Sequence, residues 1–314
     1  MIQGGAGTST NMNANEVIAN RALDIIGKPR GSYEIISPND HINKCQSTND
    51  SYPSSAKLGM ALQHEPLLNE MKLLIASLKN KANEFKDVIK MGRTQLQDAV
   101  PMTLGQEFGG YARTIESDLS ILSGSINRLC IVNLGGTAIG TMTAAHPSFP
   151  SIACKRLSEV SGLNIELADH LIAASSSTGT MLYFHGILKR IATKVSQVCN
   201  DLRLLSSGPR CGLHEINLPA KAPGSSIMPG KVNPVIPEVV NQAAFQVMGN
   251  DITVTIASGS GQLELNVMEP VIIFNIYQSI DMLERAFRTL RVHCIDGITA
   301  NNDVCLGYVE KSIG

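Results

Sequence analysis

The chain has 314 residues, with 26 Lys and Arg against 27 Asp and Glu, and 43% of its residues are hydrophobic. This length supports one large domain or two, and the balanced charge, without a basic stripe, argues against a role on nucleic acid or on a membrane surface. Trp is absent and aromatic residues make up only 4%, so aliphatic side chains must build the core, as they do in helix bundles.

Hydrophobic side chains recur at alternating steps of three and four residues, which predicts amphipathic helices. In chain order, we expect helices over 13–26, 51–91, 103–129, 148–161, 181–205, 237–257 and 276–294. Thr103 and Gln106 have the spacing of a capping box, and Pro237 followed by Glu238 suits a first helical turn. We therefore expect an all-α fold built on a long up-down bundle of about five helices.

Four hydrophobic stripes are expected to form the core of this bundle. They are Leu68, Met71, Ile75, Leu78, Ala82, Phe85 and Ile89; Ile115, Leu119, Leu122, Ile126 and Leu129; Met181, Phe184, Leu188, Ile191, Val195, Val198, Leu202 and Leu205; and Ile276, Ile280, Leu283, Phe287, Leu290 and Cys294. The segments before Ser51 and over 129–169 are predicted to be irregular apart from the two short helices.

Four loops, over 3–9, 46–50, 92–98 and around Ser225, are rich in hydroxyl and amide residues. Each lies near a predicted helix start, where free N–H groups and the helix dipole favour carboxylates or phosphates. The helical region 51–91 separates the second loop from the third, so we expect them at opposite ends of the bundle. The Ser225 loop should then lie with the third loop, and a site that uses all four must be assembled from several subunits.

The longest irregular stretch, 208–237, holds six of the fourteen prolines and four glycines. A loop of about 25 residues is uncommon in a compact protein unless it has a function. Its segment 224–234 reads Gly-Ser-Ser-Ile-Met-Pro-Gly-Lys-Val-Asn-Pro. Pro229 and Pro234 restrict φ there, whereas Gly224 and Gly230 permit turns that other residues resist.

Simpler interpretations remain open for these loops. Gly4–Gly7 fits a plain turn because no P-loop pattern follows it, Ser47–Asn49 taken alone fits a helix cap, and Lys231 fits a solvated charge. Neither a metal site nor a hydrolase elbow is predicted, since ligand spacing, carboxylate clusters and a G-x-S-x-G motif are absent from the sequence. The histidines, interpreted mostly as surface or core residues, are at positions 41, 64, 146, 170, 185, 214 and 293.

Seven cysteines are scattered along the chain without a C-x-x-C pair. They argue against a disulfide framework and favour a reducing, cytoplasmic location. The first residues lack the basic start and apolar run of a signal peptide, and the sequence has no stretch of 18 apolar residues. We therefore expect neither secretion nor a membrane span.

Residues 224–234 resemble the signature of the fumarase/aspartase superfamily. Segments 90–101, 200–210 and 261–270 resemble its aspartase branch, the aspartate ammonia-lyases, and the resemblance runs from Gln3 to Gly314. It implies a helical bundle that forms a homotetramer, with each active site built from three subunits. It also implies reversible deamination of L-aspartate to fumarate and ammonium without an organic cofactor or a dedicated metal.

The resemblance further divides the chain. Residues 1–46 match the remainder of an N-terminal domain, 47–296 match a central bundle domain with a catalytic loop at 208–236, and 297–314 match the start of a C-terminal domain. The chain is therefore expected to be a core fragment of a longer protein.

The same resemblance assigns roles by position. Ser225 matches the catalytic base, an alkoxide that needs nearby positive charge, from Lys231 and backbone N–H groups, and a desolvated pocket. Lys231 and Asn233 match residues that hold one carboxylate, while Asn49 and Gln95 match positions near the departing ammonium. The loop is expected to close over substrate. The residues that match an oxyanion-hole role at the other carboxylate are Thr8, Ser47, Thr48 and Thr94.

Two positions depart from the superfamily pattern. Gln95 stands where many relatives carry His, and residues 142–144 read Met-Thr-Ala where relatives commonly continue Gly-Leu-Asn. Two alternatives stay open, a fumarate hydratase and a truncated, non-catalytic oligomeric homologue. The run Ser47–Asn49 together with Gln95 favours the aspartase interpretation.

Overall fold

The computed structural model describes residues 2–222, 224–228 and 230–312, so Pro229 lies outside the described residues. The chain is mostly helical, as predicted, and in its described part strands form only two-stranded sheets. It divides into two compact units, which are described separately. The first comprises the described parts of 1–64, 124–186 and 250–278, and the second those of 65–123, 187–249 and 279–314.

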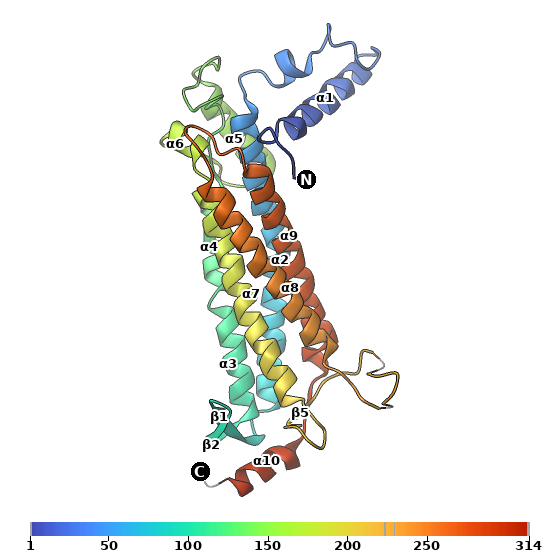
Figure 1. Ribbon diagram of the computed structural model, residues 1–314. Coiled ribbons are helices and arrows are strands. Elements are labelled where there is room, and N and C mark those ends of the chain that lie inside the picture. Colours follow the sequence, from blue (N-terminus) through green and yellow to red (C-terminus); the bar gives the residue numbers. More distant parts are fainter. Residues whose placement is uncertain (1, 223, 229, 313–314) are drawn as a thin grey trace. The chain divides into compact units, whose positions relative to one another are not determined.

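Figure 1 labels most of these elements along the chain. The α-helices are α1 (Thr8–Ile25), α2 (Thr48–Glu84), α3 (Leu104–Glu116), α4 (Leu119–Leu129), α5 (Phe149–Ser161), α6 (Leu171–Ser176), α7 (Gly179–Leu205), α8 (Val235–Gly259), α9 (Glu269–His293) and α10 (Asn302–Lys311). The strands are β1 (Ile89–Thr94), β2 (Gln97–Thr103), β3 (Ile131–Val132), β4 (Glu166–Leu167), β5 (Ile216–Asn217) and β6 (Thr299–Ala300). Two short turns of π- and 3₁₀-helix are η1 (Pro38–Ile42) and η2 (Ile295–Gly297). Among the described residues, no helix is long and apolar enough to cross a bilayer.

The first unit holds α1, η1, α5 and α6 together with the start of α2. Its strands β3 and β4 pair in parallel, with Ile131 opposite Glu166. Helix α1 lies against η1, and both precede the N-terminus of α2. This unit therefore brings two of the four polar loops into one region. Its fully buried side chains include Leu23, Met60, Leu129, Phe184, Ile272 and Ile276.

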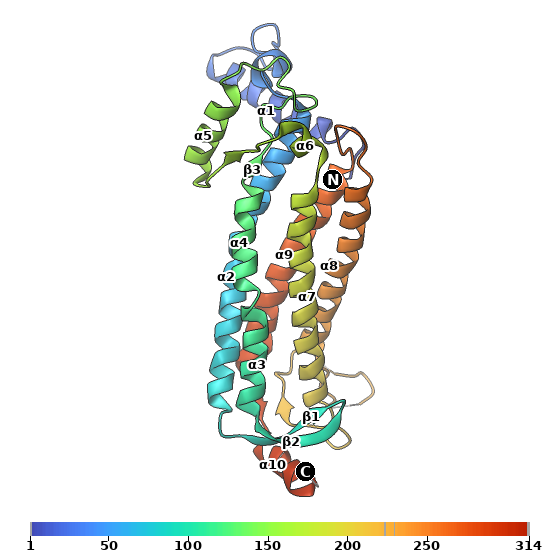
Figure 2. The ribbon, with the colours of Figure 1, turned by 90° about the vertical axis from the view of Figure 1, so that its left-hand side faces the viewer.

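The second unit holds the antiparallel hairpin β1–β2, which lies beside α10 (Figure 2). Helix α3 begins with the predicted capping box, because Thr103 Oγ1 accepts from Gln106 N at 3.1 Å while Gln106 Oε1 accepts from Thr103 N at 2.9 Å. Phe85 and Phe108 pack edge to face with ring centroids 5.3 Å apart. The predicted third and fourth stripes, whose residues are divided between the two units, are buried at every position.

The helix predicted over 51–91 is wrong at its C-terminal end, because α2 stops at Glu84. The start of α3 explains the stop. Gly105 N donates to Phe85 O at 2.9 Å and Leu104 N donates to Val88 O at 2.8 Å, so these carbonyl groups find partners outside α2. Ile89 then enters β1 and is 49% exposed rather than part of the core.

The helix predicted over 103–129 is interrupted at Ser117 and Asp118, between α3 and α4. Asp118 is fully buried there and pairs with Lys194 and Arg190, each at 2.8 Å. Lys194 Nζ also donates to Thr114 O at 3.1 Å, and Ser117 Oγ donates to the same carbonyl at 2.8 Å. Side chains that take over a helix carbonyl interrupt the backbone ladder at that point.

Candidate active site

In the first unit, Thr8 begins α1 directly after a turn that only glycine fits. Gly7 has φ of 89°, and a Cβ there would lie 2.4 Å from the Tyr52 ring. The exposed Thr8 Oγ1 donates to Gly5 O at 2.8 Å. The turn that carries Thr8 thus packs directly on the Tyr52 ring of α2. A side chain at position 7 would push the turn away from this ring.

Asn11 connects this turn to the second polar loop. Its Nδ2 donates to Thr48 Oγ1 at 3.0 Å, and its Oδ1 accepts from Ser51 Oγ at 3.2 Å. Asn43 Oδ1 accepts from the same Asn11 amide at 3.1 Å. Three predicted loop hydroxyls, on Thr8, Ser47 and Thr48, are therefore carried on segments that hydrogen bonds hold side by side.

The start of α2 is closed by Ser47 and Asp50. Ser47 Oγ accepts from Asn49 N at 3.2 Å, and Asp50 Oδ1 accepts from Ser47 N at 3.1 Å, which is the reciprocal pattern of a capped N-terminus. The other oxygen of Asp50 accepts from Thr137 N at 2.7 Å and Gly135 N at 3.1 Å. Burial nevertheless raises the pKa of Asp50 to about 6, against the effect of these N–H donors.

Asn49 is oriented by its neighbours. Its amide faces the Ala138 carbonyl at 2.8 Å, so the atom nearest that carbonyl is the donor Nδ2. The Asn49 carbonyl accepts from Asn133 Nδ2 at 3.1 Å, and Asn133 is fully buried. Oδ1 of Asn49 accepts no hydrogen bond from the described residues, and it can therefore accept one from an ammonium group.

In the second unit, Thr94 and Gln95 lie at the tip of the β1–β2 hairpin. Thr94 pairs with Gln97 across a two-residue turn in which Gln95 and Leu96 have φ of 54° and 62°. Positive φ at both central residues is the geometry of a type I′ turn. Thr94 and Gln95 are therefore exposed at a hairpin tip, and strand β2 separates them from the start of α3, near which this loop was predicted to lie.

A buried charge cluster supports this hairpin. Glu215, which is fully buried, forms an ion pair with Lys90 Nζ at 2.8 Å and accepts a hydrogen bond from Arg93 Nη1 at 2.6 Å. Lys90 also contacts Glu107 at 2.6 Å, and Arg93 lies 5.1 Å from the ring centre of Tyr308. The cluster joins the hairpin that carries Thr94 to the segment that precedes the Ser225 loop.

The Ser225 loop closes on itself. Ser225 Oγ accepts from the N–H groups of Ile227 and Met228 at 3.2 and 3.1 Å. Asn233 Nδ2 donates to Gly224 O at 2.7 Å, and a Cβ on Gly224 would lie 1.0 Å from the Lys231 carbonyl oxygen. We call this narrow closure, formed by Gly224, Lys231 and Asn233, the neck of the loop. Glycine is required at 224 by this close approach.

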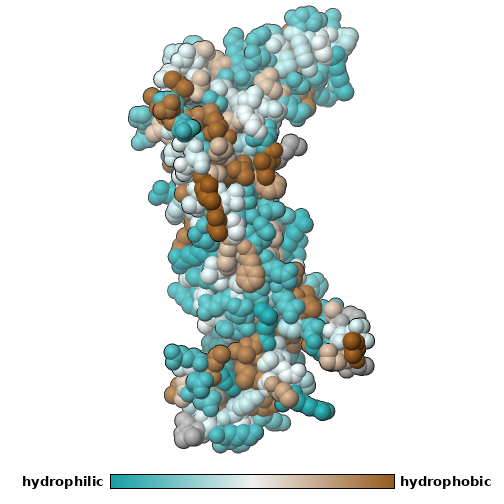
Figure 3. All heavy atoms as spheres, in the orientation of Figure 1, coloured by the Kyte–Doolittle hydropathy of each residue, from teal (hydrophilic) through white to brown (hydrophobic). Residues whose placement is uncertain are grey.

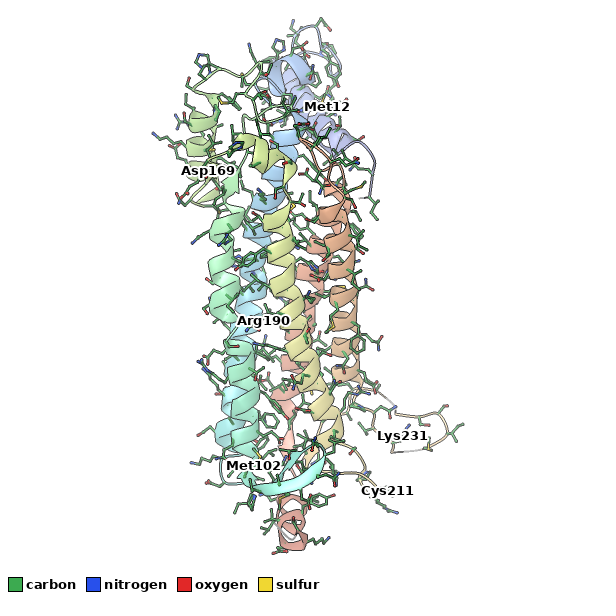
Figure 4. All side chains as sticks on the ribbon, turned by 60° about the vertical axis from the view of Figure 1, so that its left-hand side comes forward. Met12, Met102, Asp169, Arg190, Cys211 and Lys231 are labelled. Atoms are coloured by element: carbon green, nitrogen blue, oxygen red, sulfur yellow. The ribbon has the colours of Figure 1, made fainter. Side chains whose placement is uncertain are left out.

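A cavity of about 500 Å³ lies beside this loop in the second unit. Arg203, His214 and Lys231 line it together with Asn217 and Asn233, and none of its described lining residues is acidic. Such a lining favours an anionic ligand. Figure 4 shows Lys231 on the loop that extends away from the start of α8, with Cys211 on the segment before it. Ser225 is not among the lining residues.

The structure thus distributes the predicted site residues over both units. Thr8, Ser47, Thr48 and Asn49 lie in the first unit, and Thr94, Gln95, Ser225, Lys231 and Asn233 lie in the second. In the described part of the chain, no group of three or more His, Cys, Asp or Glu could hold a metal ion.

Sequence reasoning missed the residues that hold these side chains in place. Asp50 carried a signal, because Ser47 and Asp50 have capping-box spacing. Asn133 and Glu215 carried none, since their partners lie 84 and 122 residues away along the chain.

The chain matches the sequence pattern of the lyase family over residues 1–249. It is 58% identical over 315 residues to an aspartate ammonia-lyase of Pseudomonas canavaninivorans, 56% over 314 residues to one of Helicobacter pylori and 53% over 314 residues to one of Escherichia coli K12. Each match covers 100% of this chain and 66%, 67% and 66% of the relative, so the chain spans about two thirds of their length.

Solved structures agree with this relationship. A fumarate lyase:delta crystallin from Brucella melitensis bound to cobalt is 54% identical with a TM-score of 0.98, and a recombinant class II fumarase from Schistosoma mansoni is 37% identical with a TM-score of 0.95. Each alignment covers 99% of this chain and 68% of the chain in the solved structure. The chain therefore belongs to the lyase family and has the fold of the fumarase/aspartase superfamily.

Proposed function

We propose that the protein acts in the reversible deamination of L-aspartate to fumarate and ammonium. One observation carries the proposal: Ser225 Oγ accepts hydrogen bonds from two backbone N–H groups, on a loop that also includes Lys231. Donors aimed at an oxygen stabilise its anionic form, which a serine needs to act as a base. Relatives named aspartate ammonia-lyase, at 53–58% identity, support aspartate as the substrate.

In this mechanism, the Ser225 alkoxide removes a proton from the carbon next to one carboxylate. The electron pair of that C–H bond moves onto the carboxylate and gives a dianionic aci-carboxylate. When the pair returns, the carbon–carbon double bond forms, the carbon–nitrogen bond breaks and ammonia leaves. The proton on Ser225 then passes to ammonia or solvent, so that fumarate and ammonium are the products.

The remaining site residues stabilise charge in these steps. The hydroxyls of Ser47, Thr48 and Thr94 are proposed to donate to the carboxylate on which charge grows, where fixed donors lower the barrier most. Thr8 is proposed to join them once its hydroxyl turns away from Gly5 O, to which it donates in this structure. Asn49 Oδ1 is positioned to accept from the departing ammonium because its Nδ2 already donates to Ala138 O. Gln95 is proposed to contact the ammonium as well, as an amide that does not titrate.

We further propose that the working form is a homotetramer with composite sites. The loop and α8 support this. Ile227 is 84% exposed on the loop, which carries hydrophobic spheres in Figure 3. On α8, Phe245 of the second unit and Ile252 and Ile256 of the first are each more than half exposed, and the helix has no Lys or Arg. Exposed apolar side chains of this kind are typical of subunit interfaces.

The test is fumarate absorbance with purified protein, first with aspartate and then with malate. We expect turnover of aspartate that Ser225→Ala abolishes, while the matched control Ser226→Ala, which removes the neighbouring exposed hydroxyl, retains it. Turnover of malate alone would establish a fumarate hydratase, in line with the class II fumarase at 37% identity. A folded tetramer that turns over neither substrate would identify a non-catalytic homologue.

A further inference from the structure

His214 occupies a backbone conformation that few side chains tolerate. Its φ is 48°, in the left-handed region, where a residue other than glycine is uncommon and raises the free energy of the fold. Hydrogen bonds impose this conformation from both sides, since His214 N donates to Ser207 O at 2.9 Å and Asn301 Nδ2 donates to His214 O at 2.8 Å. Residues kept in such conformations cluster at binding and catalytic sites.

The imidazole of His214 is also held in one orientation. Its Nε2 lies 2.9 Å from Asn217 Oδ1. The Asn217 amide is itself fixed, because Asn217 Nδ2 donates to Asn301 Oδ1 at 2.7 Å and to Thr299 Oγ1 at 3.1 Å. Oδ1 of Asn217 is therefore an acceptor, and Nε2 of His214 must be the donor. The second ring nitrogen, Nδ1, has no hydrogen-bond partner among the described residues and is left for a ligand.

The oriented imidazole lines the cavity that also contains Lys231 and Asn233. Arg203 lines the same cavity, so an arginine and a lysine both stand beside the imidazole in its lining. Glu215, the next residue after His214, does not oppose this charge, because its carboxylate is bound by Lys90 and Arg93. A volume of about 500 Å³ is ample for a four-carbon dicarboxylate.

We propose that His214 is a substrate-binding residue that selects for a dicarboxylate, with Nδ1–H of its imidazolium donating to one carboxylate in the Lys231 cavity. This inference rests on the proposed function and deepens it by adding a residue to that site. Asn217 is the positioning residue that fixes the ring. This role accounts for the strained backbone of His214, because the conformation that raises the free energy of the folded state also places the imidazole in the wall of this cavity.

The variant His214→Gly separates binding from structure. Glycine adopts positive φ without strain, so we expect its melting temperature to equal or exceed that of the unmodified protein. In calorimetric titrations, its affinity for succinate, an unreactive dicarboxylate, should fall about tenfold, because a charged hydrogen bond is lost, while its affinity for the monocarboxylate butyrate changes little. With aspartate, KM should rise by a similar factor while kcat changes less than about threefold.

Two further variants complete the design. Leu263→Gly is a matched control for backbone strain, since Leu263 has φ of 54° and is 87% exposed outside the cavity, and it should leave succinate affinity unchanged. Asparagine tolerates the same φ, so His214→Asn is the second variant to measure if His214→Gly fails to fold. The succinate affinity of His214→Asn should also fall.

The outcomes separate this inference from the proposed function. Unchanged succinate affinity in a folded His214 variant, or equal losses for succinate and butyrate, would overturn the role of His214. Failure of the unmodified protein to bind succinate would overturn it too. Weakened succinate binding in a protein that does not deaminate aspartate would support the His214 site while removing the proposed reaction.

Discussion

Replacement of Glu215 by Gln tests whether the buried charge cluster holds the β1–β2 hairpin in place. The substitution keeps the shape of the side chain but leaves Lys90, which is 2% exposed, and Arg93, which is 14% exposed, without their shared carboxylate. Removing one partner of a buried ion pair costs about 3–5 kcal/mol of folding free energy. We expect about 3 kcal/mol, because Lys90 keeps Glu107 at 2.6 Å and Arg93 keeps the Tyr308 ring.

The free energy of unfolding, from urea titrations followed by circular dichroism, is the measurement. Hydrogen exchange of residues 89–103 should also accelerate in the variant, because the cluster connects this hairpin to Glu215. Glu116→Gln is the matched control, since Glu116 contacts Lys79 at 2.6 Å but both side chains are substantially exposed. An exposed pair contributes less than about 1 kcal/mol. Equal losses in the two variants, or a loss below about 1 kcal/mol for Glu215→Gln, would refute the reasoning.

Three further predictions concern the site and its supports. Burial raises the pKa of Asp50 from 3.8 to about 6, so between these pH values the folded state keeps a proton that the unfolded chain has lost. The free energy of unfolding should therefore fall by up to about 3 kcal/mol as pH rises from about 4 to 6. When it is measured by urea titration at several pH values, its dependence on pH over this range should be weaker in Asp50→Asn. Gly224→Ala places a Cβ 1.0 Å from the Lys231 carbonyl oxygen, so turnover should fall sharply while the melting temperature, which reports on the helices, changes little. Thr103→Ala removes the capping box formed with Gln106 and should cost about 1 kcal/mol in a urea titration, whereas Thr103→Ser should cost much less.

Local signals in the sequence predicted the local parts of the fold. The capping box at Thr103 requires only residues three apart, and it is present as predicted. The prediction that the helix and its hydrophobic stripe continue to Ile89 was wrong because distant residues end the helix earlier. The step of four from Phe85 to Ile89 fits a helix, but the hydrogen bonds that end α2 come from Leu104 and Gly105, about 20 residues further on. Periodicity alone does not contain that information.

In the candidate site, the difference between local sequence signals and contacts between distant residues is larger still. Thr8, Ser47, Ser225 and Lys231 were assigned to the site through a resemblance carried by short segments, which can be recognised without knowledge of the fold. The contacts that support their surroundings act across the fold, as when Asp50 accepts a hydrogen bond from Thr137 N, 87 residues away. A buried carboxylate at the third position of a helix reads as an ordinary cap in sequence, and only the structure shows that its second oxygen holds another loop.

The neck of the Ser225 loop places a condition on the proposed mechanism. Asn233 Nδ2 donates to Gly224 O at 2.7 Å, and the resemblance assigns the same amide to a substrate carboxylate. The amide nitrogen of Asn233 carries two N–H donors, so one can stay on Gly224 O while the other donates to a substrate carboxylate. Substrate binding by Asn233 is therefore compatible with a closed neck, and the proposed closure of the loop on substrate would move Gly224 and Asn233 together.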